Sequence, residues 1–582
     1  MILRLARSIR ENWLAALLSP LCMIGEVYME VKIPSIIGTL VDSGIEPGSI
    51  SIVWQQGLLL ILCALCSLCF GVGSAVFAAK AATGFSRNLR KDMYYKVQSF
   101  DFGSIDKFST ASIVTRLTSD VANIQMCFQM MIRMAVRCPM MVILACIRVY
   151  TLSPRLCMVY LIALPLLAIG LLTLTKLVFP IFDRGFKTID KLNNVVQENL
   201  HGIRVVKSFV RQDKEVEKFT DVSGTLYKDF SRAERIMAFN SPLMSAAVYT
   251  CIIVISYLGA TMIVQSGNTT FTTGNLTSMF TYTTQILSGL MMLSMVIVFL
   301  TMSRSPMRRC AELLAEEPQL RDPDNAVTEV ADGSVEFENV SFRYSQNAAH
   351  YALENVSLCI EPGQTVGIIG GTGSSKSTLV QLIPRLYDVA EGCVKVGGVD
   401  VRQYQLKALR NQVAMVLQKN TLFSGTIKEN LRWGDPNATD EELERACRLA
   451  CAHDFITAFP EGYDTYIEQG GKNVSGGQKQ RLCIARALLK KPKILILDDS
   501  TSAVDTHTDA MIRKAFAQEL PGTTKLIIAQ RVSSVQEADT ILVLDGGTVV
   551  AQGDHETLLD TCQIYREVYE SQVKGEDEAC PQ

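Results

Sequence analysis

The sequence predicts a membrane protein with two parts, a helical domain of six transmembrane spans followed by an α/β domain of the P-loop type. Three observations lead to this prediction. Long apolar stretches occupy the first half, and residues 236–303 contain no Asp, Glu, Lys, Arg or His. After about residue 332 the composition changes to short β-branched strands, glycine turns and amphipathic helices. A glycine-rich turn at residues 370–378 lies between a predicted strand and a predicted helix, which is typical of phosphate binding.

The composition agrees with a membrane protein in a reducing compartment. Hydrophobic residues make up 48% of the chain, and the mean hydropathy of +0.21 is high for a soluble protein of this length. The formal net charge of −2 provides no basic surface for nucleic acid. The 17 cysteines lie scattered among apolar residues, so we interpret them as small apolar side chains. Arg4, Arg7 and Arg10 precede the first apolar segment without a cleavage site after it, which favours a cytoplasmic flank over a signal peptide.

The apolar stretches define the expected spans. A helix needs roughly 20 apolar residues to cross a bilayer core about 30 Å thick. Residues 57–79 and 156–175 are free of charge, and the 236–303 segment is long enough for two spans. Its polar middle, residues 265–275, is expected to form the hairpin between them. Two candidates with interior charges lie at 13–41 and about 126–150, so we expect six spans.

The distribution of Lys and Arg predicts the orientation. These residues concentrate in 80–116 and 184–235, while the short links at 42–56 and 265–275 carry none. The positive-inside rule therefore places the long links and both termini in the cytosol. Apolar residues at helical spacing continue through the long links, so we expect spans two to five to extend beyond the membrane as helices.

Changes in composition also set the expected domain boundaries. The expected parts are a transmembrane domain at 1–318, a linker at 319–332, a nucleotide-binding domain at 333–572 and an acidic tail at 573–582. The tail is rich in charge and poor in apolar residues, so we expect it to be disordered.

The glycine-rich turn carries the groups that a phosphate site needs. It consists of Gly370, Gly371, Thr372, Gly373, Ser374, Ser375, Lys376, Ser377 and Thr378. Lys376 is expected to reach the β- and γ-phosphates and Ser377 a Mg²⁺ ion, which Asp498, at the end of a predicted buried strand, would hold through water. The usual pattern has glycine at position 375, and the extra Cβ of serine is expected to weaken binding while leaving the donors in place. A chance glycine-rich turn is the alternative, which the following motifs make less probable.

The string "NVSGGQKQRLCIARAL", Asn473–Leu488, resembles the signature sequence of the ATP-binding cassette (ABC) transporters. The resemblance extends over nearly the whole chain, to the half-transporters of type IV ABC exporters, in which six long helices precede one nucleotide-binding domain. It implies that Tyr344 stacks on adenine and that Gln418 senses Mg²⁺. It further implies a D-loop at 502–505, which includes Asp505, and coupling helices near 100–105 and about 203–214. The signature residues, which would touch the γ-phosphate of ATP held by the opposite subunit, are Ser475, Gly476, Gly477 and Gln478.

Two positions differ from the pattern of the resembled family. That pattern has glutamate where this chain has Asp499 and histidine where it has Gln530. A general base must lie within about 2.6–3.2 Å of the proton that it takes, and aspartate loses the length of one C–C bond, roughly 1.5 Å. Glutamine can donate a hydrogen bond to a phosphate, but it cannot carry the positive charge of a protonated imidazole. Together with Ser375, these residues predict a site that binds ATP and hydrolyses it slowly or not at all.

A weak catalytic site beside an intact signature favours a heterodimer, in which the partner supplies the glutamate and the histidine and carries an altered signature of its own. We therefore expect one half of an exporter of amphipathic drugs or lipids in the cytoplasmic membrane of a bacterium. Two alternatives remain open, an importer of metal–chelator complexes with the exporter fold and a homodimer with slow turnover. A non-transport ABC ATPase is excluded by the charge-free 236–303 segment.

Charged residues within the predicted spans are costly and indicate function. Glu26 and Glu30 share one face of the first span, and Arg133 and Arg137 share one face of the third at a similar depth. One interpretation is a structural ion-pair cluster or a set of water-contacting cavity residues. The other is that the two glutamates line the translocation cavity and attract a cationic substrate. Lys32 lies off that face and could neutralise either arrangement.

Overall fold

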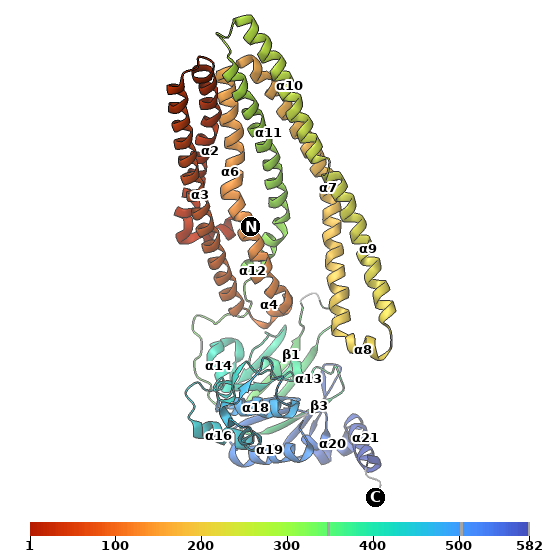
Figure 1. Cartoon of the computed structure of the whole chain (residues 1–582). Helices are drawn as coiled ribbons and strands as arrows, with labels where there is room; N and C mark the ends of the chain where they lie inside the picture. Colours follow the sequence, from red (N-terminus) through yellow and green to blue (C-terminus); the bar gives the residue numbers. More distant parts are fainter. Residues whose placement is uncertain (346–347, 349, 501–503, 580–582) are drawn as a thin grey trace. The chain divides into compact units, whose positions relative to one another are not determined.

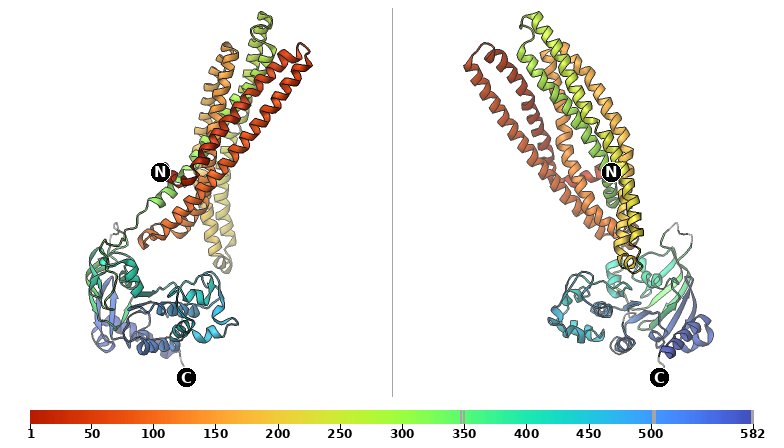
Figure 2. Two further views of the ribbon diagram at one scale, coloured as in Figure 1. Left: turned by 90° about the vertical axis from the view of Figure 1, so that its left-hand side faces the viewer. Right: turned by 45° about the vertical axis from the view of Figure 1, so that its right-hand side comes forward.

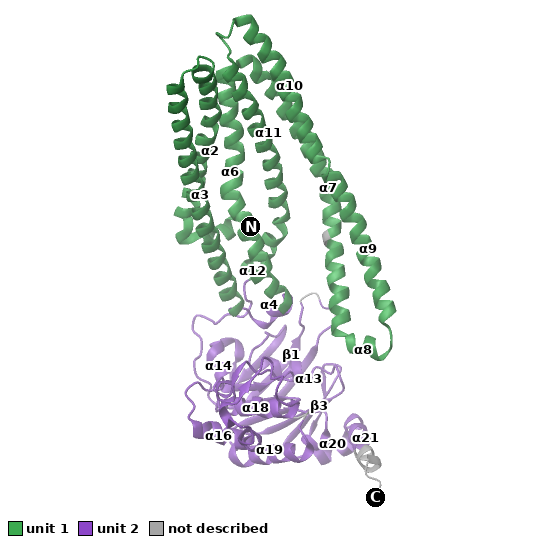
Figure 3. Ribbon diagram, in the orientation of Figure 1, with its two compact units in different colours: residues 1–98, 109–316 green, residues 99–108, 317–582 purple. Residues whose placement is uncertain are grey.

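The structure is a computed structural model that describes residues 1–345, 348, 350–500 and 504–579, with the side chains of Phe186 and of residues 573–579 left out (Figure 1). It divides into two compact units (Figure 3). Unit 1 consists of residues 1–98 and 109–316, and unit 2 consists of residues 99–108 and 317–582. The short segment 99–108 thus belongs with the second unit, although it is surrounded in sequence by the first.

Unit 1 is entirely helical over the residues described. In chain order its elements are α1 (Ile2–Ala6), η1 (Arg7–Asn12), α2 (Trp13–Thr39), η2 (Leu40–Ile45), α3 (Ile50–Gln98), α5 (Thr110–Thr115), η3 (Arg116–Asp120), α6 (Val121–Leu152), α7 (Pro154–His201), α8 (Ile203–Ser208), α9 (Gln212–Met237), α10 (Asn240–Ser266), α11 (Thr273–Met302) and α12 (Arg304–Ala315).

The six predicted spans are confirmed. Within the described residues, six helical stretches are long and apolar enough to cross a membrane, and each is 43 to 55 residues long. A bilayer core requires only about 20 residues, so the prediction that the spans extend well beyond it as helices is also confirmed. Helices α2, α3, α6 and α11 lie side by side, and α7 packs along α9 and α10 (Figures 1 and 2).

The polar segment 265–275 forms the predicted hairpin between α10 and α11. Helix α10 ends at Gly267, whose φ of +61° is a conformation that glycine adopts without strain. Thr272 caps α11 by accepting a hydrogen bond from the backbone N–H of Asn275 at 3.2 Å. Asp42, from η2, fastens this end because it accepts hydrogen bonds from the Thr272 hydroxyl (2.6 Å) and the Gly274 N–H (2.7 Å).

The core of unit 1 lies where these helices meet. Met23, Val27 and Tyr282 are fully buried there. A buried hydroxyl pair lies in this core, where the hydroxyl of Tyr160 is 2.6 Å from that of Thr283. Many apolar side chains on the outer faces stay exposed, which suits surfaces that contact lipid.

Unit 2 combines α4 (Phe102–Lys107) with an α/β domain. Its strands are β1 (Val335–Phe342), β2 (Leu353–Ile360), β3 (Thr365–Gly370), β4 (Glu391–Val396), β5 (Val399–Asp400), β6 (Val413–Val416), β7 (Gly425–Thr426), β8 (Tyr466–Ile467), β9 (Ile494–Asp498), β10 (Thr524–Ile528), β11 (Thr540–Asp545) and β12 (Thr548–Gly553). Its helices are α13 (Lys376–Leu382), η4 (Val401–Gln403), α14 (Leu406–Gln412), α15 (Ile427–Leu431), α16 (Asp440–Leu449), α17 (His453–Thr457), η5 (Gly462–Asp464), α18 (Gly476–Leu488), α19 (Thr506–Glu519), η6 (Val532–Ser534), α20 (His555–Thr561) and α21 (Gln563–Ala579).

Over the described residues, the strands form a six-stranded sheet in the order β12-β11-β3-β10-β9-β6, a four-stranded sheet β2-β1-β4-β5 and the pair β7-β8. In the larger sheet all neighbours are parallel except β11 and β12. Strands β9 and β10 are buried along their whole length, as expected for parallel strands covered on both faces. The carboxyl ends of β3 and β9 therefore lie near one another and position the phosphate turn and the acidic pair.

Two segments of the chain differ in the structure from what their composition led us to expect. Residues 317–332, most of which we expected to form a linker, group with unit 2. Helix α21 continues to Ala579, whereas disorder was expected from residue 573; residues 580–582 lie outside the described part. Glu, Gln and Lys are good helix formers, and they follow a turn of α21 that is already anchored by the buried Tyr565, so the helix propagates into the charged segment.

Candidate nucleotide site

The phosphate turn connects β3 to α13 through two left-handed residues. Gly373 has a φ of +85° and Ser375 a φ of +69°. A Cβ on Gly370 would lie 2.1 Å from the carbonyl oxygen of Leu544, so this position accepts only glycine. Ser375 is not a glycine, yet it adopts the left-handed conformation, which is strained for residues that have a Cβ. The turn directs its N–H groups and the first turn of α13 toward one space, as a phosphate site needs.

Lys376 lies over this turn. Its Nζ donates hydrogen bonds to the carbonyl oxygens of Gly370 and Gly371, both at 2.8 Å. Burial lowers the pKa of Lys376, while the nearby carboxylates of Asp498 and Asp499 act in the opposite direction. A partly desolvated ammonium group is well placed to attract anionic phosphates.

Ser377 and Asp498 meet where a Mg²⁺ ion is expected. Asp498 is the last residue of β9 and is 3% exposed, and its Oδ1 accepts a hydrogen bond from the Ser377 hydroxyl at 2.8 Å. Burial raises the pKa of Asp498 above its ordinary value, and the Asp499 carboxylate adds to this effect. Hydroxyl and carboxylate oxygens are the ligands that Mg²⁺ prefers. The residues therefore fit a Mg²⁺ ion carried in with a nucleotide.

Asp499 is held by two side-chain amides. Its Oδ2 accepts a hydrogen bond from Gln530 Nε2 at 2.8 Å and lies 3.4 Å from Gln418 Nε2. Its backbone is also constrained, with a φ of +49° and an N–H that donates to the Ile528 carbonyl at 3.1 Å. The two positions that depart from the family pattern, Asp499 and Gln530, are thus in direct contact.

Sequence reasoning missed a residue that supports Gln530. Gln572, on α21, donates from Nε2 to the carbonyl oxygen of Gln530 at 2.8 Å and accepts from the Val532 N–H at 2.8 Å. Gln572 thus holds the backbone from Gln530 to Val532 through two hydrogen bonds. Nothing in the sequence indicates this contact, because Gln572 lies 42 residues further along in a stretch without a motif.

Tyr344 follows β1 and is 53% exposed, so its ring is accessible for stacking. Its hydroxyl lies 2.9 Å from that of Thr378, at the start of α13. The ring meets Phe342 and Tyr387 edge to face, with centroids 4.9 Å and 5.2 Å apart. Tyr387 was not predicted; its hydroxyl donates to Asp106 of α4 at 2.7 Å.

The predicted signature begins α18. Ser475 and Gln478 form a capping box, in which the serine hydroxyl accepts from the Gln478 N–H and the glutamine Oε1 accepts from the Ser475 N–H. Ser475 and Gly476 are exposed, and Gly477 is half-buried. Asp505 similarly caps α19, and hydrogen bonds from the backbone and hydroxyl of Thr508 lower its pKa. Residues 501–503, which include two of the four residues of the predicted D-loop, lie outside the described part.

The structure therefore brings together the phosphate turn, the acidic pair, Gln418 and Gln530 through hydrogen bonds, whereas the signature is presented separately on α18. Comparison with known proteins agrees with this arrangement. Residues 17–291 match the family "ABC transporter transmembrane region", and residues 353–502 match the family "ABC transporter". An ABC transporter ATP-binding protein of Bacillus subtilis, YfiB, is 36% identical over 96% of both chains. The chain belongs to the ABC transporter family.

Other ABC transporters extend the comparison. The protein Rv1273c of Mycobacterium tuberculosis is 34% identical over 93% of both chains. The solved structure of a bacterial Atm1-family ABC exporter with ATP bound has a TM-score of 0.82 and 23% identity, covering 97% of this chain and 98% of that one. This ABC transporter is thus a half-transporter with the exporter fold, one membrane domain and one ATP-binding domain in a single chain. Nucleotide binding follows from the family.

The membrane part of this ABC transporter contains the predicted charges. Arg137, on α6, bridges both glutamates of α2: its Nη1 lies 2.6 Å from Glu26 Oε1 and its Nη2 lies 2.9 Å from Glu30 Oε2. An ion-pair cluster is therefore present. Arg133 is not part of it, and within the described residues its Nε is buried without a hydrogen-bond partner.

Proposed function

We propose that this chain is one half of a heterodimeric, ATP-driven exporter of amphipathic drugs or lipids, and that its own site binds ATP but hydrolyses it poorly. The proposal places the protein in a bacterial cytoplasmic membrane with both termini in the cytosol. The family and the exporter fold support an ATP-driven transporter. The contact between Asp499 and Gln530 carries the rest of the proposal.

Asp499 is poorly suited to act as a general base. Its side chain is one methylene shorter than the glutamate of the family pattern, and the left-handed backbone at this residue leaves little freedom to compensate. Its Oδ2 accepts hydrogen bonds from Gln530 and Gln418, so this oxygen is already engaged by two amides where a general base would have to contact a water molecule. Gln530 in turn offers a neutral amide where a cationic imidazolium would stabilise the charge of the transition state.

The remaining groups support nucleotide binding. Tyr344 would stack on adenine, and the turn 370–378 would hold the phosphates through its N–H groups and Lys376. Ser377, Gln418 and Asp498 would hold Mg²⁺, directly or through water. When bound, Mg²⁺ neutralises part of the phosphate charge. A site of this kind binds ATP tightly enough to hold two subunits together.

The signature of this chain would serve the partner's site. Ser475, Gly476, Gly477 and Gln478 stand at the exposed start of α18, where N–H groups and the helix dipole favour an anion. Asp505 would act beside them at the interface. We propose that the partner contributes the glutamate and the histidine, and that its own signature is altered, so that one ATP site is active and the other is weak.

The ATPase activity of three preparations tests this proposal. We expect little activity from the chain purified alone, substantial activity when it is combined with the half-transporter encoded beside it, and a gain for the double variant Asp499→Glu, Gln530→His. Ser375 remains in the double variant, so the gain is expected to be partial. The control is the Lys376→Ala form of that double variant, which should lose the gain because phosphate binding is impaired.

Three outcomes would contradict the proposal. Brisk ATPase activity and transport by the chain alone would indicate a functional homodimer. ATP-dependent movement of a metal–chelator complex toward the cytosolic face, measured in inside-out vesicles, would indicate an importer. A partner with aspartate and glutamine at the matching positions would also contradict the division into a weak and an active site.

A further inference from the structure

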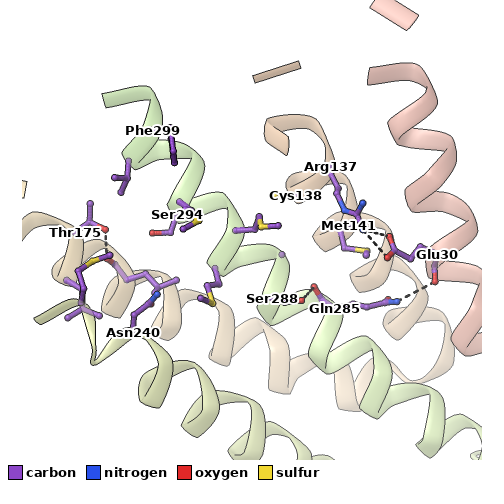
Figure 4. Close-up of a pocket in the computed structure, with 18 residues that line it drawn as sticks. Glu30, Arg137, Cys138, Met141, Thr175, Asn240, Gln285, Ser288, Ser294 and Phe299 are labelled. Atoms are coloured by element: carbon purple, nitrogen blue, oxygen red, sulfur yellow. Dashed lines mark hydrogen bonds and ion pairs between the residues drawn. The ribbon is translucent and has the colours of Figure 1, made fainter. Parts of the chain in front are cut away.

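Unit 1 contains a cavity of about 470 Å³ between α2, α6, α7, α11 and the junction of α9 with α10 (Figure 4). Cavities of this size hold small organic ligands. One part of its wall is apolar, and the opposite part carries Glu30 and Arg137. An amphipathic ligand can place its two ends against these two parts.

The apolar part is rich in methionine. Thioether side chains are flexible and polarisable, so they adapt to apolar bodies of different shapes. Leu171 and Val298 are further apolar residues of this wall. The methionines that line the cavity are Met141, which lies beside Arg137 (Figure 4), and Met237, Met291, Met292 and Met295.

The polar part carries excess negative charge. Two carboxylates, Glu26 and Glu30, share the single guanidinium group of Arg137, so the cluster has a net charge of −1 when all three are ionised. Glu30 is the more exposed of the two glutamates, with 32% of its side chain accessible against 12% for Glu26. Glu26 instead packs against α3, where a Cβ on Gly71 would lie 3.2 Å from its Cδ. Of these two glutamates, Glu30 is the one that lines the cavity.

A proline fixes the backbone at this point. Pro34 has no N–H, so the carbonyl oxygen of Glu30 lacks its usual partner four residues later. Gln285 of α11 donates from Nε2 to this oxygen at 3.4 Å. That bond sets the orientation of the Gln285 amide, and over the described residues its Oε1 is buried without a hydrogen-bond partner, as is Oδ1 of Asn240. Both residues line the cavity, and their unpaired oxygens add to its negative potential.

Two cations lie near the cluster without lining the cavity. Lys32 is turned over the ring of Tyr28, with its Nζ 5.5 Å from the ring centroid. Arg133 lies one helical turn from Arg137 and is not among the lining residues. Its charge reduces the negative potential of the cluster, but Arg133 does not line the cavity beside Glu30.

We infer that this cavity binds amphipathic organic cations, with the cationic group at Glu30 and the apolar body against the methionine wall. The inference rests on the proposed export function and names its substrate class. Glu30 contacts the ligand, whereas Glu26, Arg137 and Gln285 position it. A cationic group that donates hydrogen bonds, such as a protonated amine, suits the Glu30 carboxylate, which only accepts them when ionised.

Binding of three matched probes tests the inference without requiring ATP hydrolysis. The probes are dansyl amides with the same alkyl chain, which ends in an ammonium, a methyl or a carboxylate group. Each is titrated by fluorescence against the full chain in nanodiscs of zwitterionic lipid. We expect the ammonium probe to bind roughly five- to tenfold more tightly than the methyl probe, because a partly exposed ion pair contributes modestly, and the carboxylate probe to bind most weakly.

Variants of the same chain identify the residue responsible. Glu30→Gln should remove the preference for the ammonium probe and leave the affinity for the methyl probe unchanged. Glu30→Asp keeps the charge and should retain most of the preference, which excludes misfolding as the cause. Glu46→Gln, an exposed carboxylate of the same unit outside the cavity, is the matched control and should change nothing. Met295→Ala should weaken all three probes alike.

Equal affinities of the three probes for the unaltered chain would overturn the inference. So would a Glu30→Gln variant that keeps the preference, or a Glu46→Gln variant that loses it. None of these results bears on whether the partner's site hydrolyses ATP, and the ATPase measurements described above do not depend on probe charge. Failure of the substrate class and failure of the heterodimer are therefore distinguishable.

Discussion

Ser375 holds a left-handed conformation in the phosphate turn, at the position where glycine is usual. We predict that Ser375→Gly tightens ATP binding roughly two- to fivefold, because it removes a Cβ where the backbone approaches phosphate and relieves strain of about 1 kcal/mol. Isothermal titration with ATP and with a non-hydrolysable analogue measures the change.

Asn339→Gly is the matched control for this prediction. Asn339 also has a positive φ, of +47°, but it lies in β1, whereas the phosphate turn follows β3. Relief of strain there should alter thermal stability and leave nucleotide affinity unchanged. An equal effect of both substitutions on affinity would show that the Cβ of Ser375 does not hinder phosphate.

For single residues, the sequence indicates which side chains can take part in the chemistry better than it indicates which neighbours hold them in place. Asp499 and Gln530 could be singled out because each lies beside a recognisable motif, and their residue types limit what they can do. Their direct hydrogen bond could not be predicted, because it depends on the backbone conformation of Asp499. Gln572 and Tyr387 gave no signal, since a glutamine or tyrosine outside a motif has many possible roles.

Among the elements, α4 is held by one carboxylate. Asp101 caps α4 by accepting from the Ser104 N–H at 2.7 Å, and it also accepts from the backbone N–H groups of Gln319 (2.6 Å) and Leu320 (3.1 Å). Burial raises the pKa of Asp101, but these hydrogen bonds outweigh burial and lower it overall. The carboxylate thus ties the segment 99–108 to residues 317–320 within unit 2.

Asp101→Asn should lower the free energy that holds the segment 99–108 to residues 317–320 by about 1–2 kcal/mol, because one of the accepting oxygens is replaced by a donor. Because the folded-state pKa is lowered, the stabilisation is complete above the ordinary aspartate range near 3.9 and is lost as the pH falls through the lower folded value. Backbone hydrogen exchange of residues 99–108 measures this stabilisation. Unchanged protection at neutral pH would contradict the prediction.

Tyr387 links the nucleotide pocket to the same element. Its ring meets Tyr344 on one side and Phe102 of α4, with centroids 6.0 Å apart, on another. Tyr387→Phe removes only the hydrogen bond to Asp106. We predict that this variant lowers transport more than ATPase activity in the assembled transporter. The ratio of transport to ATPase activity should fall roughly two- to fivefold.

Tyr351→Phe is the control, because the Tyr351 hydroxyl donates to the Glu391 carboxylate at 3.1 Å in the same unit. It should leave the ratio of transport to ATPase activity unchanged. Equal losses of transport and ATPase activity in Tyr387→Phe would mean that the bond supports folding and does not transmit movement.

The long helices and the hairpin were predictable because both depend on local composition. Apolar runs set the spans, and a polar, glycine-containing segment set the turn at 265–275. The end of α21 was not predictable from composition, since a charged segment is helical or disordered according to what precedes it. The grouping of 99–108 with unit 2 depends on tertiary hydrogen bonds to Asp101 that no local pattern records.

For the whole molecule, the sequence indicates two parts and a family, because hydropathy and the signature are strong signals. The cavity could be predicted only in part. Glu26 and Glu30 looked equivalent by spacing, and only the packing of Glu26 against Gly71 distinguishes them. The partner and its contribution cannot be seen in one chain, so they are best tested through the asymmetry that the proposed heterodimer would show.

That asymmetry gives a prediction about the proposed heterodimer. If this chain's signature completes the active site while its own phosphate turn serves the weak one, Ser475→Ala should lower ATPase activity at least about tenfold. Lys376→Ala should lower it less, because ATP at the weak site holds the subunits together without being turned over. A functional homodimer would show the opposite order or equal losses.

Thr439→Ala provides the structural control for Ser475→Ala. Thr439 and Glu442 form the same capping box on α16 that Ser475 and Gln478 form on α18. Loss of either cap costs about 1 kcal/mol of helix stability, so both variants should show similar small shifts in melting temperature. Because only Ser475 is expected to face a nucleotide, only its variant should lose ATPase activity. Similar losses in both would mean that the serine merely stabilises its helix, and the assignment of the signature to the partner's site would fail.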